Sequence, residues 1–239
     1  AGDGFLASTK LTRTHFDVII AGGGTAGAMA ALYAARGGAE TVLIEPQYDL
    51  GGTSTLGGVS TYWFGNRYRD VEEIDRETDR IERKLGIRRG LGLWSEHDDF
   101  HAGVRGYVLL KLCLDAGVVV VFGQIAYDVV KEGKRVCGVK TAGHAGKQTL
   151  CGALVIDATG DGDLAYYAGA KTVYGSGRDC FTYWASLAQY TGTDGYRNNF
   201  SSMVMAADPE DMTRFTVLGR LRGERTFDHG AYVSMRESR

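Results

Sequence analysis

The sequence predicts an α/β fold in which helices cover a largely parallel sheet, and three features carry this prediction. A buried strand at residues 16–20, FDVII, runs directly into a glycine-rich turn, AGGGTAG, at residues 21–27. A second strand at residues 41–45, TVLIE, ends on an acidic residue, and a late strand at residues 153–157, ALVID, runs into ATGDGD. Short apolar runs rich in β-branched residues, separated by helical segments, are typical of parallel strands buried on both faces.

The composition narrows the classes of partner. Of the 239 residues, 44% are hydrophobic and 23% are charged, and the formal net charge of -2 argues against a nucleic-acid partner. The four cysteines are scattered without a C-x-x-C pair, so no metal site is predicted. No apolar run approaches the roughly 20 residues of a membrane span, which predicts a soluble protein. The chain starts at Ala1 without a methionine, so an upstream segment and the compartment stay open, with the cytoplasm favoured.

The first strand, the glycine turn and the following helix form a βαβ unit with the second strand. Gly22, Gly24 and Gly27 have the G-x-G-x-x-G spacing, and the helix at 28–36 ends at two glycines. Glu45 closes the second strand about 20 residues after the motif, where an acidic residue binds a ribose hydroxyl in dinucleotide-binding units. Such a unit predicts a pyrophosphate at the helix N-terminus.

Two amphipathic helices and a meander are expected next. The segment 71–85 has one apolar face, formed by Val71, Ile74, Thr78, Ile81 and Leu85. Its charged residues are expected in solvent, with pairs such as Asp79 and Arg83. A helix is also expected at 98–117; His97 and His101 lie at i,i+4 near its start, with no third ligand nearby. Strands are expected at 118–122, 125–130, 135–140, around 147–151, and at 153–157, which makes an antiparallel meander between two parallel strands.

The last part of the chain has weaker patterns. Residues 171–191 alternate in the manner of a strand and are rich in aromatic residues, and a helix is expected to open at Asp208 and Pro209. The chain closes with YVSMRESR at 232–239. These features favour a second, β-rich region.

The order of the motifs resembles the FAD-binding domain of the glutathione-reductase-like flavoproteins. It looks closest to the bacterial FAD-dependent oxidoreductases, which have a similar DATGDGD strand end, a similar GGT loop and a similar RESR segment. The resemblance implies a Rossmann-like three-layer domain of parallel sheet, helices and β-meander, with FAD as the cofactor. It also implies an N-terminal arm at 1–15, an FAD-binding domain at 16–170, and an incomplete start of a β-rich substrate domain at 171–239.

The resemblance implies that the loop EPQYDLGGTSTLGGVSTYWFGNR at 45–67 also contacts FAD. The second set of glycines is expected to follow the pyrophosphate and ribityl chain of FAD, the strand at 125–126 to lie beside the adenine, and residues 158–161 to approach the phosphates or the ribityl chain. The expected FAD-binding residues are Gly22, Gly24, Thr25, Ala26, Gly27, Glu45, Gly51, Gly52, Thr53, Ser54, Gly57, Gly58, Ile125, Ala126, Ala158, Gly160 and Asp161. Ser54 stands where related disulfide reductases have a cysteine, which excludes a thiol–disulfide enzyme of that type.

The resemblance further implies an oxidoreductase that transfers a hydride between flavin N5 and an unidentified small organic substrate. The candidate catalytic residues are Tyr62, Asn66, Arg67, His229 and Arg236. No segment of 171–239 matches the part with which the family completes its flavin site, so a second polypeptide or a C-terminal fragment is expected to supply it. Two alternatives stay open: a flavin-binding electron-transfer subunit without its own substrate site, and a nicotinamide-dependent enzyme that uses only the first βαβ unit.

Overall fold

The computed structural model describes residues 6–7, 11–57, 70–87, 100–173, 183–190, 196–205, 208–222 and 235–237. The chain divides into two compact units. The first unit is formed by Ala1–Gly52 and Gly106–Thr172, and the second unit by Thr53–Arg105 and Val173–Arg239. The domain boundaries expected at 15 and 170 stay a prediction.

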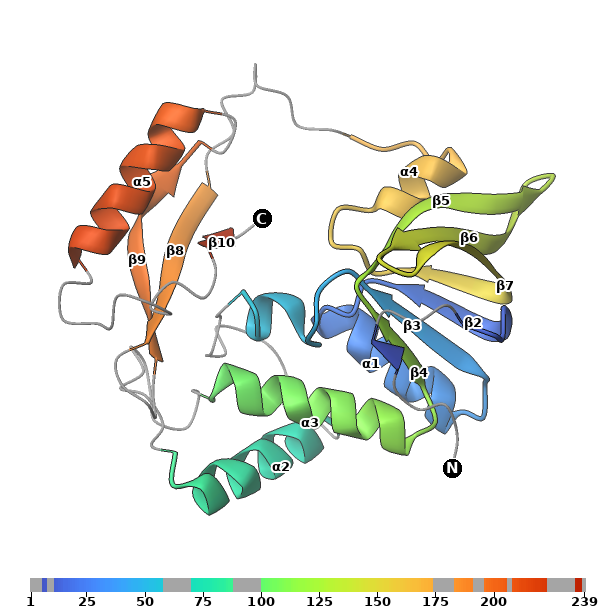
Figure 1. Cartoon of the computed structure of the whole chain (residues 1–239), viewed down its shortest axis with the longest axis horizontal. Coiled ribbons are helices and arrows are strands. Elements are labelled where there is room, and N and C mark those ends of the chain that lie inside the picture. Colours follow the sequence, from blue (N-terminus) through green and yellow to red (C-terminus); the bar gives the residue numbers. More distant parts are fainter. Residues whose placement is uncertain are drawn as a thin grey trace. The chain divides into compact units, whose positions relative to one another are not determined.

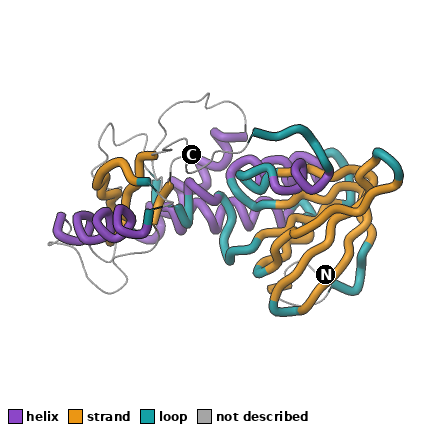
Figure 2. Tube along the Cα trace, turned by 90° about the horizontal axis from the view of Figure 1, so that it is seen from above, coloured by secondary structure: helices purple, strands orange, loops and turns teal. Residues whose placement is uncertain are grey.

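A seven-stranded sheet forms the centre of the first unit (Figure 1). Its strands, in spatial order, are β1 (Leu6–Ala7), β4 (Val119–Phe122), β3 (Thr41–Glu45), β2 (His15–Ala21), β7 (Gly146–Asp157), β6 (Arg135–Gly143) and β5 (Gln124–Glu132). The pairs from β1 to β7 are parallel, and β7, β6 and β5 pair antiparallel. The predicted α/β fold, with a meander joined to a parallel sheet, is thereby confirmed. In Figure 2 the long strands of the meander follow one another as orange tubes joined by short teal turns.

Strand β7 corrects the prediction at one point. The segments around 147–151 and 153–157 were expected as separate strands, but they form one strand of 12 residues. Its first half pairs with β6 as far as Cys151, and its second half pairs with β2 from Cys151 onward. Gly152 does not break the strand, because it lies under Ile19, whose Cδ1 would be 2.9 Å from a Cβ at position 152.

Two helices of the first unit pack on different parts of the sheet, one on the parallel strands and a short one mainly on β5. Helix α1 (Thr25–Arg36) packs on β2 and β3, and its end at Gly37–Gly38, with Gly38 at φ 90°, is as predicted. The short helix α4 (Asp163–Ala168) follows β7 directly and was not expected. The buried core contains Ile19, Ile44, Val121, Val139 and Leu150, which come from both the parallel strands and the meander.

Helix α2 (Asp70–Leu85) contains a buried charge that the prediction placed in solvent, and helix α3 (Ala102–Asp115) contains another buried charge. Asp79 and Arg83 do form the expected exposed pair at 2.6 Å. Glu82, however, is only 1% exposed, because its Oε1 accepts a hydrogen bond from the backbone N–H of His101 at 2.7 Å. Arg105 is 5% exposed, and its Nη1 pairs with Asp75 Oδ1 at 2.7 Å.

His101 caps helix α3 rather than lying inside it. Its Nδ1 accepts a hydrogen bond from the backbone N–H of Val104 at 3.3 Å, and burial lowers the pKa of its imidazole, with the charge of Glu82 opposing. The neutral ring is the form that accepts this bond. The helix therefore begins at Ala102, four residues later than predicted, and the nitrogen facing the helix is already occupied.

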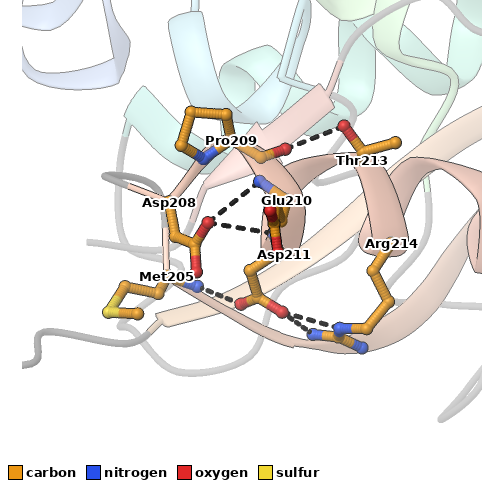
Figure 3. Close-up of polar contacts among 7 residues, drawn as sticks. All are labelled: Met205, Asp208, Pro209, Glu210, Asp211, Thr213 and Arg214. Atoms are coloured by element: carbon orange, nitrogen blue, oxygen red, sulfur yellow. Dashed lines mark hydrogen bonds and ion pairs between the residues drawn. The ribbon is translucent and has the colours of Figure 1, made fainter.

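The second unit contains a three-stranded antiparallel sheet in the order β10 (Met235–Glu237), β8 (Tyr183–Tyr190) and β9 (Tyr196–Val204), together with helix α5 (Pro209–Arg222). Helix α5 packs on β9 and begins at Asp208–Pro209, as predicted. Asp208 Oδ1 accepts hydrogen bonds from the backbone N–H groups of Glu210 at 2.9 Å and Asp211 at 3.4 Å (Figure 3). Among the described helices none is long and apolar enough to cross a membrane.

Candidate functional site

The first glycine turn is built so tightly that two of its positions accept no side chain. Gly22, at the end of β2, has φ +95°, and a Cβ there would lie 2.2 Å from the carbonyl oxygen of Ala158. A Cβ at Gly27 would lie 1.8 Å from the carbonyl oxygen of Gly22. The turn after β2 is thus pressed against the loop after β7, and α1 against the turn.

The N-terminus of helix α1 is left open. Gly24 occupies the N-cap without any side-chain hydrogen bond, the first turn contains no acidic residue, and nothing lies within 4 Å of a Cβ built on Gly24. Thr25 and Ala26, the next two residues, are exposed. The first N–H groups of a helix lack intrahelical partners and carry partial positive charge, so this end fits an anion such as a pyrophosphate.

The second glycine loop is joined directly to the first. Gly51 forms a parallel bridge with Gly24, and its N–H donates to the carbonyl oxygen of Gly23 at 2.8 Å. The hydroxyl of Thr25 donates to the carbonyl oxygen of Gly51 at 3.0 Å. A Cβ at Gly52 would lie 2.9 Å from Gly24 Cα. The two loops therefore form one backbone surface around the helix N-terminus.

Glu45 holds the turn in this shape. Its Oε2 accepts from the N–H of Gly23 at 2.6 Å, its Oε1 accepts from the N–H of Gln47 at 2.7 Å, and the residue is 7% exposed. Burial raises the pKa of the Glu45 carboxyl, and the two backbone donors oppose that rise. Each carboxylate oxygen keeps a second lone pair, which matches the predicted bond to a ribose hydroxyl.

The loop after β7 forms the third side of the site. Asp157 Oδ1 accepts from the backbone N–H and the hydroxyl of Thr159 at 3.1 and 2.7 Å, and its Oδ2 accepts from the N–H of Ala165 at 2.8 Å. Gly160 follows with φ +90°, and a Cβ there would meet nothing within 4 Å. Gly160 and Asp161 are exposed, so this turn also presents open backbone.

The family comparison agrees with this arrangement of loops. Residues 17–236 match the family model described as FAD dependent oxidoreductase, which is most of the chain. The chain belongs to this family. The predicted family, its FAD cofactor and its oxidoreductase class are thereby confirmed at the level of the family.

Curated relatives of this FAD dependent oxidoreductase family member match part of their own length. A thiamine thiazole synthase of Methanococcus maripaludis is 28% identical over 166 residues, which cover 65% of this chain and 60% of the relative. A 5-taurinomethyluridine-[tRNA] synthase subunit MTO1 of Pongo abelii is 35% identical over 98 residues, which cover 36% of this chain and 14% of the relative. The chain thus spans about three fifths of the thiazole synthase.

Solved structures share the fold. A geranylgeranyl bacteriochlorophyll reductase-like protein of Thermoplasma acidophilum matches with a TM-score of 0.55 at 18% identity. The match covers 94% of this chain and 64% of the reductase-like chain. The L-proline dehydrogenase of P. horikoshii matches with a TM-score of 0.54 at 11% identity, and the match covers 93% of this chain and 79% of the dehydrogenase chain.

The residues predicted to bind FAD divide between the two units. Thirteen of them lie in the first unit: Gly22, Gly24, Thr25, Ala26, Gly27, Glu45, Gly51, Gly52, Ile125, Ala126, Ala158, Gly160 and Asp161. Ile125 and Ala126 are the second and third residues of β5; Ile125 is 53% exposed, whereas Ala126 is 7% exposed. Thr53, Ser54 and Gly57 belong to the second unit, where a Cβ at Gly57 would lie 2.7 Å from Thr53 Cα.

The predicted catalytic residues stay predictions. Four of them, Tyr62, Asn66, Arg67 and His229, lie outside the described residues, as does the predicted FAD-binding residue Gly58. Arg236 lies on β10, in register with Ser186 of β8. Two carboxylates near the loops were not assigned from the sequence. The first is Asp157, which holds the loop after β7 by its hydrogen bonds to Thr159 and Ala165. The second is Asp49. Burial raises the pKa of Asp49 to about 6; the N–H of Leu50 opposes this rise and the charge of Glu45 adds to it. The Asp49 carboxylate packs against α3, where a Cβ at Gly106 would lie 2.2 Å from its Oδ1.

Proposed function

We propose that this chain is the nucleotide-binding part of an FAD-dependent oxidoreductase that acts on a small organic substrate. The observation that supports this most is the N-terminus of α1, which three loops border and which has no side-chain cap and no acidic residue in its first turn. The donor groups fit FAD, because the dinucleotide carries a pyrophosphate for the helix end and a ribose for the acid beside it.

The residues of the chain have distinct roles in this proposal. The N–H groups of residues 24–26 bind the pyrophosphate, Glu45 accepts from the ribose, and Gly160 and Asp161 approach the phosphates or the ribityl chain. Thr53, Ser54, Gly57 and Gly58 continue the track toward the flavin, and Tyr62, Asn66, Arg67, His229 and Arg236 are the candidates for substrate contact. Bound FAD would supply a hydride acceptor or donor at N5.

We also propose that a second polypeptide or a further fragment completes the protein. Strand β7 supports this. Residues 152–157 pair with β2 on one side, and in the described part of the chain no strand pairs with their other side. Leu154 in this stretch is 53% exposed, whereas Ile19 and Ile20 of the neighbouring β2 are fully buried. Strands inside a parallel sheet are normally covered, so an additional extended segment at this edge would bury Leu154.

The absorbance spectrum of the purified protein tests the cofactor, and anaerobic titration tests the reaction. We expect flavin bands, and bleaching of those bands by at least one member of a panel of amino acids, amines, alcohols and hydroxy acids. A protein without flavin bands that also fails to bind added FAD would contradict the proposal. Bands that only an electron-transfer partner bleaches would instead support the electron-transfer subunit.

Native mass spectrometry tests the second segment. We expect a companion polypeptide in the preparation, and we expect Leu154→Asp to release it while Leu43→Val, a change inside β3, retains it. A preparation that contains the 239-residue chain alone, with FAD bound as tightly as in other flavoproteins, would contradict this part of the proposal.

A further inference from the structure

Asp49 is a half-buried carboxylate with no role in the proposed function. It lies in the loop between β3 and Gly51, and its carboxylate packs on helix α3 so closely that a Cβ at Gly106 would overlap both of its oxygens. Within the described part of the chain, its one hydrogen-bond donor is the N–H of Leu50, 2.8 Å from Oδ1. A charged carboxylate in such a place has lost water without gaining the donors that would replace it.

The groups that face Asp49 do not neutralise it. Burial raises the pKa of Asp49 to about 6, and the charge of Glu45, at the end of β3, adds to this rise. Arg105, the residue before Gly106, pairs with Asp75 at 2.7 Å instead. The residues on the same face of α3 as Gly106, three and four positions away, are Ala102, Gly103, Leu109 and Leu110, and all are uncharged.

Asp49 is also close to the loops that we propose for the pyrophosphate. It precedes Gly51 by two residues, which span at most about 7 Å. Gly51 forms the bridge with Gly24, the N-cap of α1. The other titratable side chain of this loop, Tyr48, has its hydroxyl beside Gly123. Charges are screened over about 8 Å at physiological salt, so the carboxylate of Asp49 is within the field of an anion at the start of α1.

We propose that Asp49 couples the binding of FAD to the uptake of a proton, so that the second glycine loop holds the cofactor more tightly in acid than in alkali. This inference rests on the proposed function and gives a role to a residue outside it. A bound pyrophosphate disfavours the ionised form of Asp49, because like charges repel strongly where water is excluded. Binding therefore raises the pKa of Asp49 further. FAD affinity is greatest below about pH 6 and falls as the pH rises through the pKa values of the free and the bound protein.

Isothermal titration of the FAD-free full chain with FAD, with any companion polypeptide retained, tests this coupling. FAD has no terminal phosphate, so its own pyrophosphate does not titrate between about pH 5.5 and pH 8. We expect FAD to bind about tenfold more tightly at pH 5.5 than at pH 8. We also expect about half a proton to be taken up per FAD near pH 6.5, measured from titrations in buffers of different ionisation enthalpy.

Asp49→Asn has the shape of the neutral carboxyl and does not ionise. It is expected to take up no proton and to bind FAD at pH 8 about as tightly as the unchanged protein does at pH 5.5. The unfolded chain ionises Asp49 more readily than the folded chain, so the variant is also expected to melt above the unchanged protein at pH 8. The two melting temperatures are expected to converge below about pH 4. A purely structural role would instead lower the affinity and the melting temperature at every pH.

Asp115→Asn is the matched control. It removes the same charge from the other end of α3, where Asp115 is exposed and pairs with Lys111, so the pH dependence of FAD affinity is expected to stay unchanged. Gly106→Ala retains the acid but moves it: the added methyl group is expected to displace the Asp49 carboxylate into water and to abolish the proton uptake.

Two results would overturn the inference and leave the proposed function standing. One is equal FAD affinity at pH 5.5 and pH 8. The other is proton uptake that persists in Asp49→Asn, which would assign the proton to Glu45, whose pKa burial also raises. A chain that binds no FAD at any pH would overturn both the inference and the proposed function.

Discussion

The N-termini of helices α1 and α5 differ in whether side chains accept hydrogen bonds from their first backbone N–H groups. Both helices begin with backbone N–H groups that have no partner inside the helix. At α5, Asp208 accepts from two of these groups, and Glu210 and Asp211 add negative charge to the first turn. At α1, Gly24 offers no side chain and the first turn contains no acidic residue.

The difference separates an end that stabilises its own helix from an end that is kept for a ligand. Acidic residues at a helix N-terminus are favourable, so their absence at α1 gives up stability that a single substitution would supply. The loops around the start of α1 are fixed in place by short hydrogen bonds, and Thr25, Ala26 and Gly160 are exposed. An anion that binds there meets donors already in position.

The largest effect is expected when the α1 end is given the chemistry of the α5 end. Gly24→Asp places a carboxylate where a Cβ meets nothing within 4 Å, so the fold is expected to tolerate it, with a change in unfolding free energy of about a few tenths of a kcal/mol. Because the new charge faces the pyrophosphate, FAD affinity is expected to fall by on the order of 100-fold. Fluorescence titration with FAD measures this.

Gly24→Asn is the control for the shape of that side chain. It caps the helix without a charge, so it is expected to weaken FAD less than Gly24→Asp does. Equal FAD affinity in the aspartate variant and in the unchanged protein would show that the α1 end does not bind the pyrophosphate.

A smaller effect is expected when the α5 end is opened. Asp208→Ala removes the acceptor for the N–H groups of Glu210 and Asp211 and is expected to cost about 1 kcal/mol of unfolding free energy, whereas Asp208→Asn costs less. Urea unfolding measures the loss. FAD affinity is expected to stay unchanged, and a parallel fall in FAD affinity would contradict the separate roles of the two helix ends.

The smallest effect concerns pH. The N–H of Met205, followed by the guanidinium of Arg214, holds the pKa of Asp211 below its ordinary value of 3.8. The folded state therefore prefers the ionised form, and the stability that Asp211 contributes is present above the unfolded pKa and is lost as the pH falls through the lower folded pKa. Asp211→Asn is expected to melt below the unchanged protein at pH 7, and the two melting temperatures are expected to converge on acidification. A constant difference down to pH 2 would contradict this.

The βαβ unit could be predicted from the sequence because its parts are local. The spacing of Gly22, Gly24 and Gly27, a β-branched run on either side, and an acid at the end of the second strand each reflect contacts within one short segment. Asp208 and Pro209 predicted the start of α5 for the same reason.

Features that depend on distant partners could not be predicted in this way. Glu82 looks like one more solvated charge on a helix, but its partner is the N–H of His101, 19 residues later. Gly152 looks like a strand break, and only the side chain of Ile19 above it shows why the strand continues. Both glycine loops were assigned to the cofactor from the sequence, but their direct bridge between Gly24 and Gly51 became visible only in the structure.

Strand β7, which pairs with both β6 and β2, also determines when the first glycine turn can fold during synthesis. Leu11 and Gln148, which join the start of the chain to the first half of β7, are 137 positions apart. The turn at Gly22 lies against Ala158, which follows the second half of the same strand. A nascent chain that has released only the glycine turn, α1 and β3 therefore holds an unsupported loop, because contacts between distant segments form late. The ribosome must release residue 158 before the first glycine turn has its neighbour, so a chain stalled earlier would expose β2 and β3 as free strand edges.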